Sequence, residues 1–404
     1  MNDMERLFEY HDNYVAQTPM DFVRGIINEI DWNSRLIVIK GPKGVGKSTI
    51  MLQYIKLHFE PNDRHVLYCS ADTSYFSNHT LVETADTFAK MGGRYLFIDE
   101  VHKYENWSRE IKEIYDLHRN MHIVLSGSSL IQLNDGDADL SRRMVEYNMP
   151  GLSYREFLWF EAGIRFDKIS LEDLLSSPND YCMEVKAKCH PLEFFPTYLR
   201  QGYYPFCFEN KRTYPIQVEN VINYIINQEL TVNRKLEVGN TRKIKALLQV
   251  LSQIVPYEVD IKKLSTVTSL QRLTVLNYLR YLEEANLIRR LFANLSTITD
   301  LQKPDKILMD NPNLLYVLSN VTPQIGTARE CFFCNQLASA GHVVEYGGKT
   351  TGDFRIDGKT IIEVGGKDKD FSQIKQTRNA FVAADDIETA VFKKIPLWAF
   401  GCLY

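Results

Sequence analysis

The chain has 404 residues, 45% of them hydrophobic and 24% charged, with a net charge of -4. These values are typical of a globular protein with several domains and exclude a disordered or fibrous chain. The small negative charge excludes a chain that is basic throughout, so any contact with nucleic acid must be local. The sequence has no apolar stretch of 18 residues and no apolar signal segment at its start. We therefore expect a cytoplasmic protein without a membrane span.

The N-terminal part alternates between helical and strand patterns. Residues 1–34 are expected to be helical, because Phe22, Ile26, Ile27 and Ile30 recur at helical spacing. Five apolar runs are typical of buried strands: 35–41, 65–72, 94–100, 122–128 and 144–150. Strands that alternate with helices predict an α/β fold with a parallel sheet covered on both faces.

A phosphate-binding loop follows the first strand. The segment from Gly41 to Ser48, GPKGVGKS, matches G-x-x-x-x-G-K-[ST] and lies between a strand and a helix, a context that a chance match would lack. Its glycines let backbone amides surround phosphates, Lys47 is expected on the β- and γ-phosphates, and the Ser48 hydroxyl on Mg²⁺. The predicted ATP-binding residues are Gly41, Gly44, Val45, Gly46, Lys47, Ser48 and Thr49.

Two carboxylates end the third strand, in the segment LFIDE. Asp99 is expected to hold the Mg²⁺ shell, and Glu100 to orient and polarise the attacking water. The second acid favours a hydrolase over a kinase or GTPase arrangement. Alternatively, the two acids lie in a solvated turn without a functional role. The P-loop about fifty residues upstream favours the functional interpretation.

Hydroxyl groups end the fourth strand in the segment LSGSS. Ser126 is the preferred candidate for a contact with the γ-phosphate or the attacking water, and Ser128 is the second. Either serine could instead serve only in a local turn or as a helix cap.

The chain changes character near Ser153. Helical segments are expected there, with an aromatic turn region at 195–206. The segment 242–292 is expected to form three helices and then a strand, and 294–305 a wing or linker. The last hundred residues return to a mixed α and β pattern.

Cysteine use gives little support for a metal site. Cys331 and Cys334 have the spacing of zinc ligands, but they lie in an amphipathic helical segment without a second pair. We interpret them as small buried hydrophobic residues.

These motifs together resemble a known family. In chain order, DEVHKYENWSREIKEIYD, LSGSSL, SRRMVEYNMPGLSYREFL and YLRQGYYPF are similar to segments of AAA+-type, additional-strand P-loop ATPases of bacteria and archaea that have a C-terminal domain of unknown function. The resemblance implies an ATPase core, a helical lid, a winged-helix segment and an α/β domain similar to PD-(D/E)xK restriction endonucleases. The corresponding ranges are 1–155, 156–235, 236–303 and 304–404.

The resemblance also indicates an arginine near the γ-phosphate. Arg143 lies where the family has this residue, although Ser141-Arg142-Arg143 replaces the family's small-Gly-Arg and leaves the register uncertain by one. The arginine would act in its own site or in that of a neighbouring subunit. Alternatively, both arginines only flank a strand.

Basic residues accompany the expected winged helix, and they could contact DNA phosphates. They are Lys262, Lys263, Arg272, Arg280, Arg289 and Arg290. Modules of this kind can also bind protein alone, and the nearby Glu283 and Glu284 are typical of a solvated face.

The C-terminal part has a candidate second site at Glu330, Asp353 and Glu363. A nuclease of the implied type needs such acids for a divalent metal and a lysine that positions water. Gly365 occupies the usual lysine position, and Lys367 is the first substitute to consider, ahead of Asp368 and Lys369. We favour a degenerate, structural domain over a nuclease.

The sequence thus predicts an ATP- and Mg-dependent ATPase that acts as a nucleotide-driven switch or remodeller. Its target would be DNA, through the winged helix, a protein partner, or a further copy of the chain in a homo-oligomer. The alternatives are an ATP-gated metal-dependent nuclease and a regulatory ATP-binding protein with negligible turnover.

Overall fold

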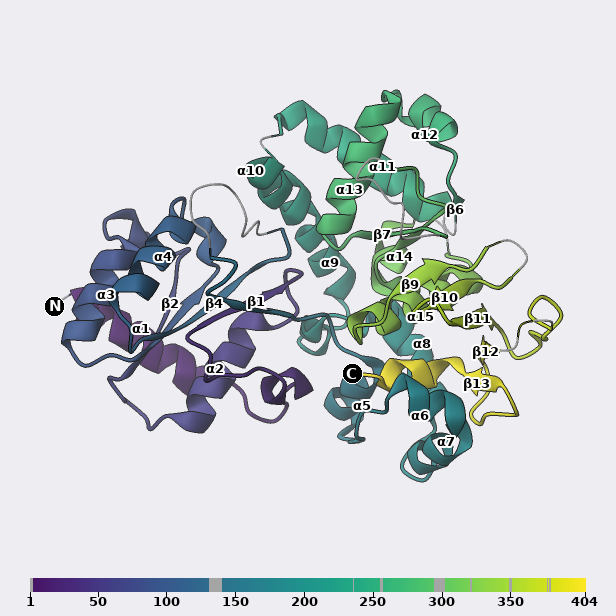
Figure 1. The fold of residues 1–404 in the computed structure, drawn as a ribbon, viewed down its shortest axis with the longest axis horizontal. Coiled ribbons are helices and arrows are strands. Elements are labelled where there is room, and N and C mark those ends of the chain that lie inside the picture. Colours follow the sequence, from purple (N-terminus) through teal and green to yellow (C-terminus); the bar gives the residue numbers. More distant parts are fainter. Residues whose placement is uncertain are drawn as a thin grey trace. The chain divides into compact units, whose positions relative to one another are not determined.

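The computed structural model describes most of the chain, and the statements below concern the described residues. These are 3–130, 140–234, 236–254, 257–293, 302–319, 322–348, 351–375, 377 and 379–404. They form two compact units, Met1–Pro150 and Gly151–Tyr404 (Figure 1). Most of the expected wing, 294–301, lies outside the described residues.

The first unit contains five strands and the helices between them. Its elements are α1 (Asp3–Gln17), η1 (Gly25–Asn28), β1 (Leu36–Gly41), α2 (Lys47–His58), β2 (Val66–Ser70), η2 (Ser74–Ser77), α3 (Leu81–Lys90), β3 (Tyr95–Asp99), η3 (Val101–Lys103), α4 (Trp107–Leu117), β4 (His122–Ser128) and β5 (Val145–Asn148). The strands form one sheet in the order β2-β3-β4-β1-β5, and every neighbouring pair is parallel. The predicted parallel sheet is confirmed.

The expected helix over residues 1–34 is wrong in its second half. Helix α1 ends at Gln17, and only the short turn η1 interrupts the segment before β1. Pro19 explains the early end, since a proline disfavours helical backbone in the residue before it. The Gln53 side chain then donates to the carbonyls of Pro19 and Phe22, which anchors the segment to α2.

Helices cover both faces of this sheet, as the buried strands require. On one face, alternate residues such as Val38 and Ile98 form a hydrophobic core with residues of α1, α3 and α4. On the other face, Tyr54 of α2 packs against Phe97 of β3 with ring centroids 6.2 Å apart. The continuous apolar runs of the sequence therefore correspond to strands buried on both sides.

The second unit begins with helices. They are α5 (Tyr154–Ala162), α6 (Leu171–Ser176), α7 (Pro178–Lys186), α8 (Pro191–Gln201), η4 (Pro205–Phe208), α9 (Tyr214–Tyr224), the π-helical turn η5 (Ile225–Glu229) and α10 (Leu230–Arg234). The predicted turn region at 195–206 is wrong in its first half, because α8 continues to Gln201. Pro196 is accommodated inside this helix.

Three helices and a small antiparallel sheet follow. They are α11 (Val238–Ile254), β6 (Tyr257–Glu258), α12 (Ile261–Thr268), α13 (Arg272–Glu284), β7 (Ile288–Leu291) and β8 (Lys306–Met309). The sheet has the order β6-β8-β7.

The rest of the chain builds a mixed sheet. Its elements are α14 (Pro312–Leu318), α15 (Ile325–Ser339), β9 (Val344–Tyr346), β10 (Phe354–Ile356), β11 (Thr360–Gly365), β12 (Ala380–Ala384), β13 (Lys394–Pro396) and η7 (Leu397–Cys402). The order is β13-β12-β11-β10-β9, with antiparallel pairs on the β9 side and parallel pairs on the β13 side. Asp357 and Gly358 both have positive φ, as expected for the tight turn between β10 and β11.

Buried aromatic rings join the helical part of the second unit to its C-terminal part. Phe332 of α15 packs edge-on against Phe195 and Tyr198 of α8, with centroids 4.9 and 5.7 Å apart. The Asn313 side chain accepts a hydrogen bond from the Tyr203 backbone and donates to carbonyls of α8. Residues 151–404 therefore share continuous packing, whereas their division at 235 and 303 remains a prediction.

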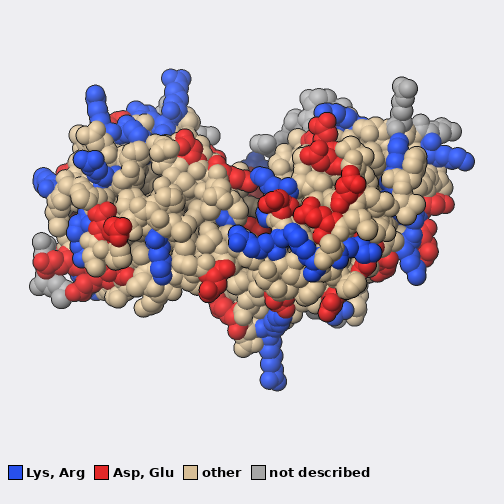
Figure 2. Space-filling view, turned by 90° about the horizontal axis from the view of Figure 1, so that it is seen from below, with Lys and Arg blue, Asp and Glu red and all other residues tan. Residues whose placement is uncertain are grey.

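Charges of both signs are interspersed over the surface shown in Figure 2. Within the described part of the chain, no helix combines the length and apolar character needed to cross a membrane.

Candidate functional site

The P-loop lies at the carboxyl edge of the parallel sheet. Gly41 ends β1 and Lys47 begins α2. Gly44 and Gly46 have φ angles of +86° and +98°, a region that glycine adopts without strain. A Cβ atom on Gly41 would lie 2.2 Å from the carbonyl oxygen of Met149, so glycine is required there by close packing.

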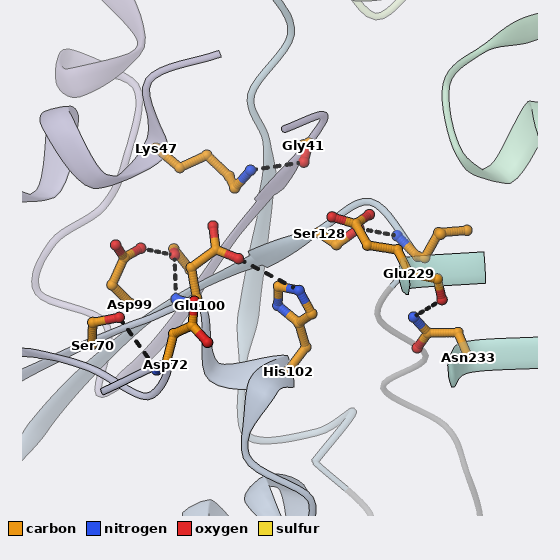
Figure 3. Close-up of polar contacts among 12 residues, drawn as sticks. Gly41, Lys47, Ser70, Asp72, Asp99, Glu100, His102, Ser128, Glu229 and Asn233 are labelled. Carbon is orange, nitrogen blue, oxygen red and sulfur yellow. Dashed lines mark hydrogen bonds and ion pairs between the residues drawn. The ribbon is translucent and has the colours of Figure 1, made fainter. Parts of the chain in front are cut away.

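The Lys47 ammonium is buried against its own loop. Its Nζ donates to the carbonyl oxygens of Gly41 and Pro42, at 2.9 and 3.0 Å (Figure 3). Ser48 and Thr49 follow in the first turn of α2, half-buried and exposed respectively. The predicted nucleotide-binding residues 41–49 are therefore contiguous in space around a helix N-terminus, the arrangement that favours bound phosphate.

An arginine that the sequence analysis missed supports this loop. Arg24 is only 5% exposed, and its Nη1 donates to the carbonyls of Val45 at 3.2 Å and Pro150 at 2.6 Å. Nothing in the sequence around Arg24, a single arginine in a segment expected to be helical, indicated that it contacts the P-loop.

Asp99 lies at the end of β3 and is held by hydroxyl groups from both neighbouring strands. The Tyr68 hydroxyl donates to Asp99 Oδ2 at 2.7 Å, and the Ser126 hydroxyl donates to Oδ1. Ser126 Oγ also accepts from the Glu100 backbone N–H at 3.0 Å. The carboxylate is 5% exposed and oriented from two sides. Tyr68 was not predicted, because a tyrosine in a buried strand is most simply a core residue.

Glu100 adopts a left-handed backbone conformation, with φ +50°, which is uncommon for a residue with a side chain and is found at functional sites. Its carboxylate lies 3.5 Å from Nε2 of His102, a side chain that is only 8% exposed (Figure 3). Burial, together with Lys103, Lys47 and Lys43, lowers the pKa of His102 to about 3. His102 is therefore neutral near pH 7, and among the described residues neither of its buried ring nitrogens has a hydrogen-bond partner. After Arg24 and Tyr68, His102 is the third residue near this site that the sequence analysis missed.

The two serine candidates differ in their contacts. The Ser126 hydroxyl proton is directed to Asp99, so a direct contact with phosphate remains a prediction. Ser128 Oγ accepts from the Leu130 backbone N–H at 3.3 Å, the local turn considered as its alternative role.

Arg143 does not lie at the P-loop of its own chain. The register of β1 with β5 pairs Ile37 with Val145, so Arg143 lies at the amino edge of the sheet, the end opposite Lys47. Its guanidinium contacts Asp116 at 3.2 Å. The prediction that it acts on the γ-phosphate of its own site is wrong. Arg142 is exposed and precedes the same strand.

Half of the basic residues expected to contact DNA are engaged within the protein. Arg280 pairs with Glu284 at 3.3 Å, Arg290 with Glu283 at 2.6 Å, and Arg289 with Asp310 at 3.0 Å. The remaining three, Lys262, Lys263 and Arg272, are exposed on α12 and at the start of α13.

The three C-terminal acids gather at one end of the mixed sheet, as expected. Glu330 lies in α15, Glu363 in β11, and Asp353 immediately before β10. Asp353 Oδ2 accepts from the backbone N–H of Val364 at 2.8 Å. Burial raises the pKa of Glu330, as does the negative charge of Asp353, against the opposing effect of Lys306.

Two lysines neutralise this group of acids, and neither is the predicted Lys367. Lys306 Nζ lies 2.5 Å from Glu330, and Lys369 Nζ lies 2.5 Å from Glu363. The side chain of Lys367 is exposed, so its predicted place at the acids is wrong.

Gly365 explains why Lys369 is the residue that reaches the acids. A Cβ atom on Gly365 would lie 2.7 Å from Cβ and Cγ of Lys369. The missing side chain therefore leaves the space through which Lys369 approaches Glu363.

No group of three or more His, Cys, Asp or Glu side chains is arranged to hold a metal ion within the described ranges. Cys331 and Cys334 are buried in α15, and burial raises the pKa of Cys334 to about 12, which disfavours the thiolate that zinc requires.

Two family models match segments of the chain. Residues 33–158 match the family AAA_14, described as an AAA domain, and residues 192–325 match DUF8612, a domain of unknown function. The second match spans the expected boundaries at 235 and 303.

Two proteins of Methanocaldococcus jannaschii are similar in sequence. The uncharacterized protein MJ1637 is 24% identical over 75% of this chain and 70% of its own length. The uncharacterized protein MJ1544 is 23% identical over 63% of this chain and 56% of its own length.

Two solved structures share limited similarity. A STAND protein with a tetratricopeptide repeat sensor, PH0952 of Pyrococcus horikoshii, is 14% identical over 80% of this chain and 46% of its own, with a TM-score of 0.30. PCH-2 of C. elegans is 15% identical over 45% of this chain and 55% of its own, with a TM-score of 0.24. The AAA-domain match, with the loop and carboxylates described above, supports a P-loop ATPase.

Proposed function

We propose that this chain is a Mg-dependent ATPase that acts as a nucleotide-driven switch or remodeller. The observation that supports it best is that Lys47 at the start of α2, Asp99 at the end of β3 and Glu100 directly after it lie at the same edge of a parallel sheet. Ligands of such sheets bind at the carboxyl ends of the strands.

The side chains near the P-loop fit a magnesium ion. Ser48 offers a hydroxyl and Asp99 a carboxylate, the hard oxygen ligands that Mg²⁺ prefers. Each Asp99 oxygen accepts one hydrogen bond, which leaves further lone pairs for a metal-bound water. When bound, Mg²⁺ would neutralise charge on the β- and γ-phosphates.

The chain's own groups then have separate roles. Lys47 exchanges its two loop carbonyls for phosphate oxygens, so its ammonium keeps hydrogen-bond acceptors in both states. Glu100 accepts the proton of the attacking water as general base, and neutral His102 lies 3.5 Å from its carboxylate. Ser126 and Tyr68 fix Asp99, whereas Arg143 could act only on another subunit.

For the target, we propose DNA or a protein partner bound by the expected winged-helix segment, 236–303. The support is the succession of α11, β6, α12, α13, β7 and β8 with a three-stranded antiparallel sheet. Lys262, Lys263 and Arg272 would contact phosphates. Three exposed basic residues give this segment only a small positively charged surface. A protein partner is therefore the alternative to DNA.

For the C-terminal acids, we propose a structural role. Lys306 and Lys369 supply the positive charge that a metal would otherwise provide. A nuclease remains the second candidate, favoured by the position of Lys369 beside Glu363. A regulatory protein with negligible turnover is the third.

ATP hydrolysis by the full chain, measured with and without duplex and single-stranded DNA, tests the proposal. We expect Lys47→Ala to abolish tight ATP binding. Glu100→Gln should keep ATP bound but lower turnover by about 100-fold. Loss of a general base lowers turnover by about 10²- to 10⁴-fold. Turnover of Glu100→Gln at the wild-type rate would show that Glu100 is not the base. Absence of turnover with every ligand would favour the regulatory protein.

A further inference from the structure

A pocket lies at the amino edge of the parallel sheet, the edge opposite the P-loop. It has a volume of about 430 Å³ and is lined by Arg35, Arg94, Tyr95, Arg119, Asn120 and His122. Arg35, Arg94 and His122 lie at the starts of β1, β3 and β4 respectively. None of the six lining residues, all of them described, is acidic, although the whole chain has 51 Asp and Glu against 47 Lys and Arg.

Two side chains at the base of this pocket, Arg35 and His122, are held in place by contacts within the protein. Arg35 Nη2 donates to the carbonyls of Tyr115 at 2.8 Å and His118 at 3.2 Å, and its guanidinium lies 3.9 Å from the centre of the Tyr115 ring. The His122 ring stacks on Tyr95, with centroids 4.9 Å apart. Both side chains are therefore positioned before any ligand arrives, which lowers the entropic cost of binding.

Two buried nitrogen atoms in this base lack a hydrogen-bond partner among the described residues. They are Nε of Arg35 and Nδ1 of His122. A buried polar group without a partner costs free energy, and such groups are normally satisfied by water or a ligand. Arg35 Nε is a donor only, so its missing partner must be an acceptor.

The other two arginines are exposed. Arg94 and Arg119 have no side-chain hydrogen bond or ion pair with any part of the chain that the structure describes. The Arg94 backbone is held beside β4, since its carbonyl accepts from the His122 N–H at 2.7 Å. By contrast, Arg143 at the same edge is paired with Asp116. Like charges that gather without an acid repel one another, and an anionic ligand removes this repulsion.

We propose that this pocket binds the phosphate group of a small phosphorylated compound, independently of the ATPase site. Guanidinium forks bind phosphate oxygens in pairs, and several arginines around one pocket match the multiple charge of phosphate better than the single charge of a carboxylate. The concave shape favours a free phosphate compound over the phosphodiester backbone of nucleic acid, which shares the same chemistry.

The test uses the full chain with Lys47→Ala, so that the P-loop does not contribute to phosphate binding. Calorimetric titration with inorganic phosphate and with tripolyphosphate should show one site, with tripolyphosphate the tighter ligand. Adding Arg94→Gln and Arg119→Gln should raise the dissociation constant at least tenfold. These side chains are exposed, so the fold should be retained, as circular dichroism can verify.

The matched control removes two exposed arginines elsewhere, Arg109→Gln and Arg212→Gln, and should leave binding unchanged. An equal loss in this control would show non-specific attraction and overturn the proposal, as would the absence of binding at millimolar anion. A third titration uses a single-stranded oligonucleotide. Its binding through Arg94 and Arg119, without binding of either small anion, would overturn the small-ligand proposal in favour of nucleic acid.

Discussion

Asp99 receives a hydrogen bond on each carboxylate oxygen, from Tyr68 on β2 and Ser126 on β4. Hydrogen bonds to a charged group contribute about 1.5–3 kcal/mol, more than neutral ones. Since both donors come from strands of the same rigid sheet, the carboxylate has little freedom to rotate. The orientation of Asp99 on β3 is therefore determined by its contacts with the two adjacent strands. Tyr68 on β2 and Ser126 on β4 both lie outside the Asp99-Glu100 pair itself.

We expect Tyr68→Phe and Ser126→Ala each to raise the Mg²⁺ concentration that gives half-maximal ATP hydrolysis, by about three- to tenfold. This corresponds to a cost of about 1 kcal/mol in orienting Asp99. Hydrolysis at saturating Mg²⁺ should be less affected. Tyr104→Phe is the matched control, because it removes a hydroxyl that donates to Glu110 at 2.8 Å elsewhere in the same unit. An unchanged Mg²⁺ dependence in both variants would contradict this role.

At the scale of secondary-structure elements, α1 is attached to the sheet through a buried histidine. The backbone N–H of Tyr68 in β2 donates to Nδ1 of His11 at 2.9 Å, and His11 is 3% exposed. Burial lowers the pKa of His11 to about 4, with a smaller contribution from Arg64 and opposing ones from Asp12 and Asp63. The hydrogen bond requires an unprotonated Nδ1.

We therefore expect the attachment of α1 to weaken on acidification. The unfolded histidine binds a proton below pH 6.5 and the folded one only near pH 4, so this contribution to stability is present above pH 6.5 and is lost between these values. Through this one group, the free energy of unfolding changes by at most about 1.4 kcal/mol per pH unit. Hydrogen-exchange protection of the Tyr68 amide, corrected for intrinsic rates, should fall from pH 7 to pH 5. His11→Asn, whose side-chain oxygen replaces Nδ1, should remove this dependence; an unchanged slope would contradict the assignment.

The exposed basic residues of α12 and α13 give a second prediction at this scale. If the chain binds DNA, replacing Lys262, Lys263 and Arg272 together by Ala should weaken binding. The slope of log K against log salt concentration should become shallower by up to about 2.7, because each phosphate that the protein no longer neutralises lowers the slope by about 0.9.

Replacement of Lys90, Arg109 and Arg212, which are exposed elsewhere, should change neither affinity nor slope. Fluorescence anisotropy at several salt concentrations measures both quantities. DNA affinity that persists unchanged in the first variant would place the interaction outside α12 and α13.

At the scale of the whole molecule, the chain has two compact units, and each has candidate metal-binding acids at one end of its sheet. In the first unit, the Asp99 carboxylate is held by neutral hydroxyls and remains available to a metal. In the second, Glu330 and Glu363 are each paired with a lysine. We therefore expect the same residue types to have opposite effects on metal binding in the two units, because their partners differ in charge.

We expect the wild-type chain to show no Mn²⁺ binding at the C-terminal acids up to millimolar metal. The measurement is calorimetric titration with Mn²⁺. The heat measured for Asp353→Ala is subtracted from that of the wild-type chain, which removes any contribution from the first unit. Lys369→Gln should increase Mn²⁺ affinity, because it leaves Glu363 without its counter-ion. Heat in the wild-type chain that disappears in Asp353→Ala, together with metal-dependent nicking of plasmid DNA, would instead support the nuclease.

The sequence by itself determined the P-loop, the five strands and their parallel sheet. Each depends on a contiguous segment: an apolar run, a glycine with positive φ, or a motif between a strand and a helix. Such signals come from neighbours along the chain, so one sequence is enough to recognise them.

Only the tertiary structure decided which charged groups meet. Lys369 rather than Lys367 reaches Glu363 because the missing Gly365 side chain leaves it room. Arg143 lies beside Asp116 because the register of β5 places it at the amino edge of the sheet. The pocket formed by Arg35, Arg94 and Arg119 joins residues that precede three different strands or lie in their connections. The pairing of long charged side chains depends on strand order, register and local free volume, none of which is encoded in a single segment.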